Sequence, residues 1–260
     1  NVQSYYYWSS TTHANQTSFA WYVNMWKGTM GDGTPKDPTS TLYFYVWYVW
    51  PVRSGQVDNS DPLYPATIWK TGQTKCYDST GTEITCAGTG QDGEIRAGVA
   101  WPNPRFTDNS NGTITDNLTG LMWLKDANCI NTRYPSFDND STSGDGEVTW
   151  QHALDFVSGI NSGTYSDCGA GYNDWHLPNR KELRSLIDYL NYSPALPAGH
   201  PFTNLLAKFY EDYFVWWSST TGADYLNGAW AIVVSAGYMH GPSDKGNSHF
   251  AVWPVRGGQV

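Results

Sequence analysis

Short apolar and aromatic runs, separated by Gly, Pro, Asn and Ser, recur along the chain and predict strands joined by turns. Residues 5–8 and 19–23 have the Tyr, Trp, Phe and Val content typical of strands. A half-exposed strand alternates apolar and polar residues, whereas one run here is apolar throughout and predicts a strand that is covered on both faces. Its members are Tyr43, Phe44, Tyr45, Val46, Trp47, Tyr48, Val49 and Trp50.

Two segments in the second half have helical periodicity. Thr149 precedes a pattern with Ala153, Leu154, Val157 and Ile160 on one face, and Gly163 lies just beyond it. The second segment begins at Asn179, with Glu182 at the capping-box position, and its apolar stripe predicts a core-facing helix. That stripe consists of Leu183, Leu186, Ile187 and Leu190.

The chain contains one series of motifs twice. Trp8-Ser-Ser-Thr-Thr12 and Ala20-Trp21 recur as Trp217-Ser-Ser-Thr-Thr221 and Ala229-Trp230, with an offset of 209 (217 − 8 and 230 − 21). Trp50-Pro-Val-Arg53 recurs as Trp253-Pro-Val-Arg256 with an offset of 203 (253 − 50). Internal similarity of this length predicts two related structural units.

The two copies differ in what precedes them. We therefore interpret residues 1–57 as the β-rich rear part of one unit, residues 58–70 as a linker and residues 71–260 as a complete unit. A partial unit cannot bury its apolar face alone. Residues 246–253 are more polar than residues 43–50, so we expect the first copy to be covered on a face that the second leaves in solvent.

Composition limits the classes of function. Charged residues make up 15% of the 260 residues, aromatic residues make up 16%, and Gly and Pro are frequent, which is typical of a loop-rich extracellular domain. The net charge of −9 argues against a nucleic-acid partner. No run reaches the roughly 18 apolar residues of a membrane span.

The four cysteines lack the C-x-x-C spacing of zinc and redox sites. Cys76 and Cys86 flank the turn at residues 78–81, which would place them opposite each other on neighbouring strands. We expect disulfides Cys76–Cys86 and Cys129–Cys168 and a secreted protein. The alternative is four buried free thiols.

Several motifs together resemble the Lcl C-terminal domain family, a domain of bacterial surface and adhesin proteins. The resemblance covers about residues 99–258, whereas residues 1–57 match only the last third of the family pattern. His176 stands where the family usually has Arg. The motifs are Asn111-Gly-Thr-Ile-Thr-Asp-Asn-Leu-Thr-Gly-Leu-Met-Trp123, Val148-Thr-Trp-Gln-His-Ala-Leu154, Asp174-Trp-His-Leu-Pro-Asn-Arg-Lys-Glu-Leu-Arg-Ser-Leu186, Trp217-Ser-Ser-Thr220 and Val255-Arg-Gly-Gly258.

The resemblance implies an α+β, C-type-lectin-like fold with a twisted antiparallel sheet, two flanking helices and long loops. It also implies a binding scaffold on the bacterial cell surface, with members that adhere to sulfated polysaccharides. A net charge of −9 disfavours such an anionic ligand here. The similarity to formylglycine-generating enzymes is more distant.

No catalytic constellation is evident, and we expect a protein that is not an enzyme. The six histidines have no metal-ligand spacing, and nothing resembles a P-loop or a nucleophile elbow. An oxidase related to formylglycine-generating enzymes would need a free reactive thiol. We expect no cofactor other than, as one alternative, calcium.

Calcium could use the oxygen atoms of Asp108, Asn109, Asn111 and Asp116. The glycine of this segment is one position short of the EF-hand spacing, so we favour a plain turn. For ligand contact, the aromatic residues of variable loops are the candidates, because rings stack on sugars. These are Trp26, Tyr225 and Tyr238.

We favour the hypothesis that the chain assembles with itself, head to tail, into an extracellular multimer or filament. The orphan segment 1–57 and its doubly apolar run at 43–50 form the predicted assembly interface, through β-augmentation. The alternative is a glycan-binding adhesin domain that does not need residues 1–57.

Overall fold

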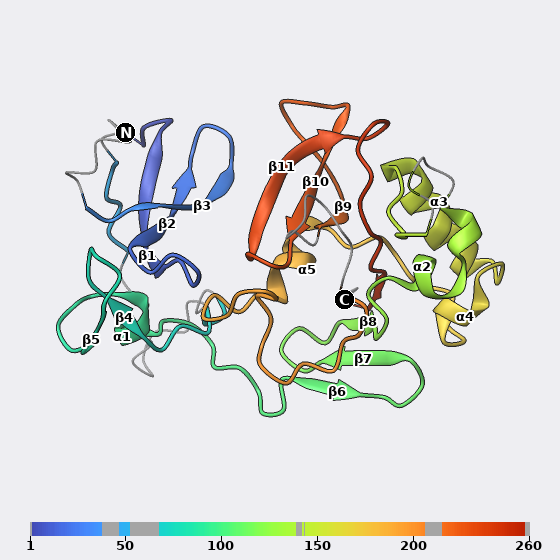
Figure 1. Cartoon of the computed structure of the whole chain (residues 1–260), viewed down its shortest axis with the longest axis horizontal. Helices are drawn as coiled ribbons and strands as arrows, with labels where there is room; N and C mark the ends of the chain where they lie inside the picture. The colour runs from blue at the N-terminus through green and yellow to red at the C-terminus, as the bar shows by residue number, and fades with distance from the viewer. Residues whose placement is uncertain are drawn as a thin grey trace, which may run out of the picture. The chain divides into compact units, whose positions relative to one another are not determined.

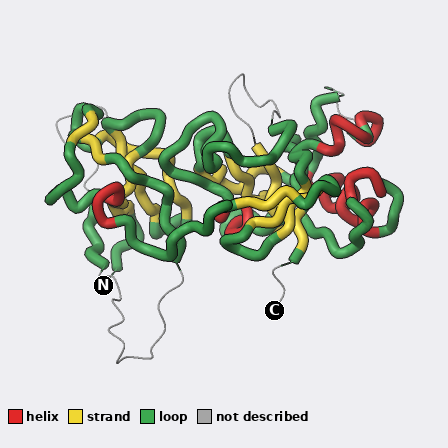
Figure 2. Tube along the Cα trace, turned by 90° about the horizontal axis from the view of Figure 1, so that it is seen from below, coloured by secondary structure: helices red, strands yellow, loops and turns green. Residues whose placement is uncertain are grey.

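The structure is a computed structural model, and it describes residues 2–37, 47–52, 68–138, 142, 144–205 and 215–257. It is an α+β protein with several antiparallel sheets and short helices, as the sequence predicts. Loops make up much of the trace (Figure 2). The C-type-lectin-like character stays a prediction.

Two compact units form the chain. One contains residues 1–101 and 188–191, and the other contains residues 102–187 and 192–260. Residues 71–101 thus group with the N-terminal strands. The predicted linker at 58–70 lies, up to residue 67, outside the described residues. The predicted domain boundary there stays a prediction.

The first unit contains a three-stranded antiparallel sheet in the order β1-β2-β3, a short hairpin and one helical turn (Figure 1). The side chains of Tyr7, Ala20 and Trp21 are buried in it. The elements are β1 (Tyr6–Thr12), β2 (Phe19–Asn24), β3 (Thr29–Pro35), β4 (Cys76–Tyr77), β5 (Glu83–Ile84) and α1 (Asp92–Ile95).

The second unit contains a three-stranded sheet, β9-β10-β11, and a four-stranded sheet, β12-β8-β7-β6. The strands are β6 (Phe106–Asp108), β7 (Thr113–Asp116), β8 (Met122–Leu124), β9 (Val215–Thr221), β10 (Gly228–Val233), β11 (Tyr238–Asp244) and β12 (Val255–Arg256). The helices are α2 (Cys129–Arg133), a 3-10 turn (Pro135–Phe137), α3 (Trp150–Asn161), α4 (Ser166–Gly169) and α5 (Arg180–Ser185).

Tryptophan forms much of the core of the second unit. Trp123, Trp216, Trp217 and Trp253 are fully buried. The indole N–H of Trp216 donates to the Ala127 carbonyl at 2.9 Å, and that of Trp253 donates to the Leu124 carbonyl at 2.8 Å. These bonds offset the cost of burying an indole N–H.

Both predicted helices are present. Asn179 closes a capping box with Glu182 at the start of α5, and Leu183 is fully buried, as the sequence predicts. Helix α5 ends at Ser185, so three residues of the predicted stripe, Leu186, Ile187 and Leu190, lie beyond it. Thr149 is the N-cap residue of α3, but its side chain forms no capping hydrogen bond.

The cysteines pair as the sequence predicts, Cys76 with Cys86 and Cys129 with Cys168. One detail differs. The register of the β4–β5 hairpin places Cys76 opposite Ile84, not opposite Cys86. Cys86 follows the end of β5 and reaches Cys76 from there, with a Cα–Cα distance of 5.2 Å.

The sheets β1-β2-β3 and β9-β10-β11 have the same register. Trp8 pairs with Tyr22, and Trp217 pairs with Ala231, an offset of 209 in both strands (217 − 8 and 231 − 22). Both β1 and β9 carry a register shift at the same place, between Trp8 and Thr12 and between their counterparts. The pairing of β2 with β3 recurs in β10 with β11 at the same offset.

A fourth segment joins each sheet in the same way. Tyr48 forms a parallel bridge to Tyr7, and Ala251 forms a parallel bridge to Trp216. The offset of this segment is 203 (251 − 48), the same as that of the motif that follows it in sequence. The offsets between paired positions in the two sheets are therefore the same as the offsets between the repeated motifs in the sequence.

The two copies of this fourth segment differ in burial. Tyr48, Val49 and Trp50 are 42%, 73% and 53% exposed. The counterparts Ala251, Val252 and Trp253 are 0%, 1% and 0% exposed, whereas Gly246 and Asn247, earlier in the same stretch, are exposed. Trp253 is buried because it packs against the rings of Trp123, Phe202 and Trp216, which come from distant parts of its own unit.

Candidate binding site on the N-terminal sheet

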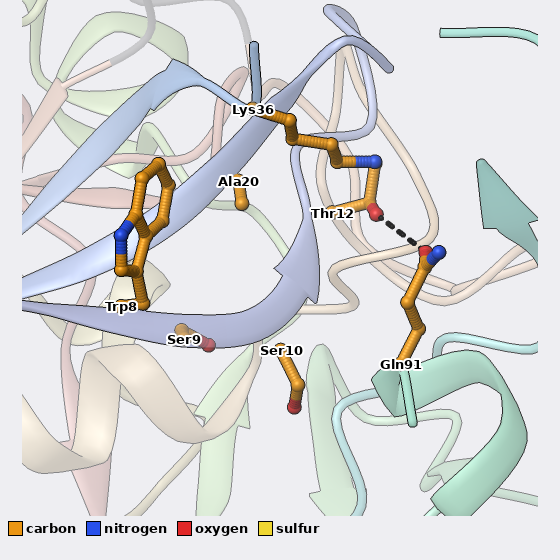
Figure 3. A pocket seen from close by; sticks show the side chains of 7 residues that line it. All are labelled: Trp8, Ser9, Ser10, Thr12, Ala20, Lys36 and Gln91. Atoms are coloured by element: carbon orange, nitrogen blue, oxygen red, sulfur yellow. Dashed lines mark hydrogen bonds between the residues drawn. The ribbon is translucent and has the colours of Figure 1, made fainter. Parts of the chain in front are cut away.

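A cavity of about 280 Å³ lies in the first unit where β1, β2 and α1 meet (Figure 3). In the close-up, the indole of Trp8 forms one side, and Gln91 reaches in from the start of α1 on the other. The cavity is lined by Trp8, Ser9, Ser10, Thr12, Ala20, Lys36 and Gln91.

The register shift in β1 gives the cavity its floor. Ser9 lies in the shifted stretch, and its hydroxyl accepts a hydrogen bond from the Thr11 N–H at 3.1 Å. Pairing resumes at Thr12, opposite Ala20. A bulge of this kind bends a strand and redirects its side chains, which accounts for the concave surface at residues 9–12.

Gln91 fixes the other wall. Its amide nitrogen donates to the Tyr77 carbonyl at 3.0 Å, and its amide oxygen accepts from the Tyr77 N–H at 3.1 Å. The same oxygen accepts from the Thr12 hydroxyl at 3.4 Å. Gln91 therefore connects the disulfide-bonded hairpin to the sheet.

Among the described residues of the lining, Lys36 alone supplies an ammonium group. Its Nζ donates to the carbonyls of Thr17 at 2.9 Å and Tyr77 at 3.0 Å. Burial lowers the pKa of this ammonium group, and the nearby Asp78 carboxylate opposes that shift. The rest of the lining offers hydroxyls, an amide and one indole face, and no carboxylate.

Next to the cavity lies a cluster of four half-buried rings, here called the aromatic face: Tyr6, Trp8, Tyr22 and Trp47. Trp47 is central, with ring centroids 4.7 Å from Tyr6, 5.4 Å from Trp8 and 4.5 Å from Tyr22. The ring of Tyr22 crosses its neighbour Gly31 on β3, and any Cβ at that position would overlap it.

The segment 47–50 joins the sheet edge beside this face. Tyr48 donates its N–H to the Tyr6 carbonyl at 2.9 Å and accepts from the Trp8 N–H at 3.0 Å. It is the described part of the predicted assembly interface. Tyr43, Phe44, Tyr45 and Val46 lie outside the described residues.

The four predicted calcium ligands do not converge. Asp116 lies opposite Phe106, at the far end of the β6–β7 hairpin from the turn that contains Asn109 and Asn111. Asp116 is fully buried and forms an ion pair with Arg105 at 2.8 Å. The structure therefore separates Asp116 from the three residues nearer the turn.

The oxygens nearer the turn have partners within the protein. Asp108 forms an ion pair with Lys125 at 2.7 Å, and that contact lowers the pKa of the Asp108 carboxyl. Asn111 accepts from the Thr113 hydroxyl at 2.6 Å. Across the described ranges, no group of three or more His, Cys, Asp or Glu side chains could hold a metal ion.

The three predicted contact aromatics do not form one site. Trp26 lies in the β2–β3 turn of the first unit and is 73% exposed. Tyr225 precedes β10, and its hydroxyl donates to Asp244 at 2.9 Å. Tyr238 pairs with Val233 at the other end of β10. The five residue steps from Gly228 to Val233 separate the two ends of this strand by roughly 17 Å.

None of the helices in the described segments is long and apolar enough to cross a membrane.

Sequence reasoning singled out Trp47, but it missed Ser9, Ser10, Lys36 and Gln91. A signal was present for the lysine, because Lys36 and Lys245 are also 209 positions apart (245 − 36).

The comparison with family models matches residues 112–256 to the Lcl C-terminal domain, which is 145 of 260 residues (256 − 112 + 1). This chain belongs to the Lcl C-terminal domain family. Membership relates it to bacterial surface proteins. No curated protein and no solved structure matches the chain.

The Lcl motifs connect the C-terminal end of the matched region to its middle. Arg256, which follows the repeated Trp-Pro-Val, donates from its Nη2 to Asp174 at 2.9 Å, and this contact lowers the pKa of the Asp174 carboxyl. His176, at the position of the usual Arg, pairs its backbone with Val255 and lies 3.2 Å from Glu182. The sheet β9-β10-β11 falls inside the Lcl match, and β1-β2-β3 falls outside it.

Proposed function

We propose that this chain is a secreted, non-enzymatic structural protein of the bacterial surface whose N-terminal sheet is covered by a neighbouring polypeptide, so that copies assemble into an extracellular multimer or filament. One observation carries the proposal. Residues 48–50 are largely exposed, whereas the same strand positions in the second sheet, residues 251–253, are buried.

The shared register supports the view that the two sheets are copies of one unit. In the second copy, the covering elements come from the same chain: Trp123 and Phe202 contact Trp253. Among the described residues, the exposed segment 48–50 has no comparable cover. A neighbouring chain is the natural source of such cover.

The energetic argument rests on apolar area. Burial stabilises by about 25 cal/mol per Å² of apolar surface, and an aromatic side chain can bury roughly 150–250 Å². Covering Tyr48, Val49 and Trp50 therefore favours association. An exposed apolar edge left without cover is also prone to uncontrolled pairing.

The geometry of such a contact favours an open assembly. A sheet edge that receives a different surface of the next copy makes a heterologous contact, which continues into a filament unless the rotation closes a ring. Addition of a strand to the edge through backbone hydrogen bonds is the recognition mode expected.

The cysteine chemistry supports a non-enzymatic protein. All four cysteines are in disulfides, and these suit an oxidising extracellular environment. An oxidase related to formylglycine-generating enzymes would use a free thiol, and a thiol titration of the unfolded, unreduced chain is expected to give none.

Val49→Asp tests the proposal, with Leu226→Asp as the matched control. The two side chains are 73% and 72% exposed, so neither change should unfold the chain. We expect Val49→Asp to reduce the apparent mass in light scattering and to remove multimers from negative-stain images, and Leu226→Asp to leave both unchanged. A wild-type chain that remains monomeric at all concentrations contradicts the proposal.

Glycan binding is the second candidate. The exposed indole of Trp26, with the Lys27 ammonium 5.6 Å from the ring, is the observation in its favour, and it places this candidate within residues 1–57 rather than outside them. A glycan array with wild type and Trp26→Ala tests it. Binding that is lost in Trp26→Ala but kept in Val49→Asp supports an adhesin role separate from assembly.

A further inference from the structure

The counterpart of the N-terminal cavity is occupied in the second sheet. There, Trp150 stacks beside Ser218 and Lys245, the counterparts of Ser9 and Lys36 (218 − 9 and 245 − 36 are both 209). The Trp150 indole N–H donates to the Ser218 carbonyl at 2.9 Å, and its backbone N–H donates to the Lys245 carbonyl at 3.1 Å.

The Lys245 ammonium also lies over this indole, 4.3 Å from the ring centroid. A cation at that distance is attracted to the face of the ring. Lys245 donates to the Leu226 carbonyl, and Lys36 donates to the Thr17 carbonyl 209 positions earlier (226 − 17), so the two lysines share this bond. The second bond of Lys245 goes to the Thr221 hydroxyl, and that of Lys36 goes to the Tyr77 carbonyl.

Val148 anchors the same segment two residues earlier. Its backbone exchanges two hydrogen bonds with Phe250, at 3.0 and 3.1 Å, and its carbonyl accepts from the Trp217 indole N–H at 2.8 Å. The counterparts of these partners in the first sheet are Trp47 (250 − 203) and Trp8 (217 − 209).

The corresponding groups of the first sheet are not engaged by described residues. Neither the indole N–H of Trp8 nor the backbone N–H of Trp47 donates a hydrogen bond within the described part of the chain. Both groups lie beside the cavity or on the aromatic face. The first sheet therefore retains the donors that hold Val148 in the second.

We propose that the N-terminal cavity is a receptor for an extended, tryptophan-bearing segment of a partner polypeptide, with the chemistry of Val148-Thr149-Trp150. The partner's indole would fill the cavity beside Lys36, and its strand would pair with Trp47. This inference goes beyond the proposed self-assembly, because it concerns the occupant of the cavity and not the contact between copies at residues 48–50.

The number of segments explains why the partner is another polypeptide. Val-Thr-Trp occurs once in the 260 residues, and there it is committed to the second sheet, with Val148 buried. Every copy of the chain thus has two such sheets and one such segment, which its own second sheet holds, so the occupant of the cavity comes from a different polypeptide and not from another copy. A cavity of about 280 Å³ is also below the roughly 300–1,000 Å³ of typical small-molecule pockets, which favours a single side chain as occupant.

The test is a titration of the full chain with a fluorescein-labelled peptide of residues 146–152, read by anisotropy. The matched control peptide carries Trp150→Ala. We expect saturable, one-to-one binding of the first peptide and at least a tenfold weaker signal for the second. No binding, or equal binding of both peptides, overturns the proposal.

Protein variants locate the site. Ser10 is exposed and lines the cavity, so Ser10→Phe should fill it and abolish peptide binding. Ser79→Phe alters an exposed serine at the hairpin tip of the same unit and should leave binding unchanged. Trp8→Phe keeps a ring but removes the indole donor, and we expect about fivefold weaker binding for one lost hydrogen bond. Peptide binding unaffected by Ser10→Phe overturns the proposal.

The outcomes separate this inference from the assembly proposal. If Val49→Asp disrupts multimers but the peptide does not bind, assembly stands and the inference falls. If a glycan, rather than the peptide, binds wild type and loses binding in Ser10→Phe, the cavity is a saccharide site and the inference falls. Circular dichroism melting of each variant ensures that lost binding is not lost folding.

Discussion

The carboxylate of Asp116 is buried in an ion pair with Arg105, which indicates that the Asp108–Asp116 segment has a structural role. Arg105 and Asp116 form a two-bond ion pair with N···O distances of 2.8 and 2.9 Å, and Arg105 also donates to the Ser185 carbonyl. Asp116 further accepts from the Leu118 N–H and the Thr119 hydroxyl. The Asp116–Arg105 pair thus links the β6–β7 hairpin to the end of α5.

Asp116→Ala should be strongly destabilising. Removing the carboxylate leaves the buried Arg105 without its counter-ion, which costs about 3–5 kcal/mol in the free energy of unfolding. Asp108→Ala is the control, because its ion pair with Lys125 is partly exposed and such pairs contribute little to stability. Urea unfolding of the three proteins measures the difference. Equal stability of the two variants would be inconsistent with a structural role for Asp116.

At the scale of elements, the helix termini differ in a way that only the structure reveals. Asn179 accepts from the backbone N–H groups of Lys181 and Glu182 at 2.8 and 3.1 Å, and Glu182 returns a bond to the Asn179 N–H. Thr149 occupies the same position before α3, but its hydroxyl makes no capping bond.

Asn179→Ala should therefore lower the free energy of unfolding by about 1 kcal/mol, the usual value of a lost N-cap. Thr149→Ala should change it much less, because no capping bond is lost. Thermal melts followed by circular dichroism compare the two. An equal loss of stability in both variants would show that the capping bond at Asn179 contributes nothing.

Elements with local signals could be predicted from the sequence. The capping box at Asn179, the turn between Cys76 and Cys86 and the repeat that contains β1 and β9 all depend on neighbouring residues or on matched motifs. Burial could not be predicted in the same way. The stretch 246–253 is more polar than residues 43–50, yet its last four residues are buried, and Trp253 contacts Trp123 and Phe202, which are far away in sequence.

The cavity was unpredictable for a related reason. It depends on the register shift after Trp8 and on Gln91, which arrives from a helix about 80 positions later. Neither leaves a recognisable motif in a single sequence. The correspondence between Lys36 and Lys245 becomes informative only once Trp150 is seen beside the second lysine.

At the scale of the whole molecule, the chain combines one sheet covered by its own unit with a second sheet of the same register whose edge is exposed. The Lcl match includes the covered sheet and leaves out the exposed one. We therefore propose different roles for the two sheets, although their strands pair in the same register. One completes a domain, and the other receives a neighbour.

Hydroxyl-radical footprinting of residues 47–50 across a series of protein concentrations tests this account most directly. We predict that oxidation of Trp47, Tyr48 and Trp50 falls as multimers form, while Tyr225, which lies in the second unit, keeps its reactivity. Rings at 47–50 that stay as reactive in the assembled material as in the dilute chain would contradict the claim that a neighbour covers the N-terminal sheet.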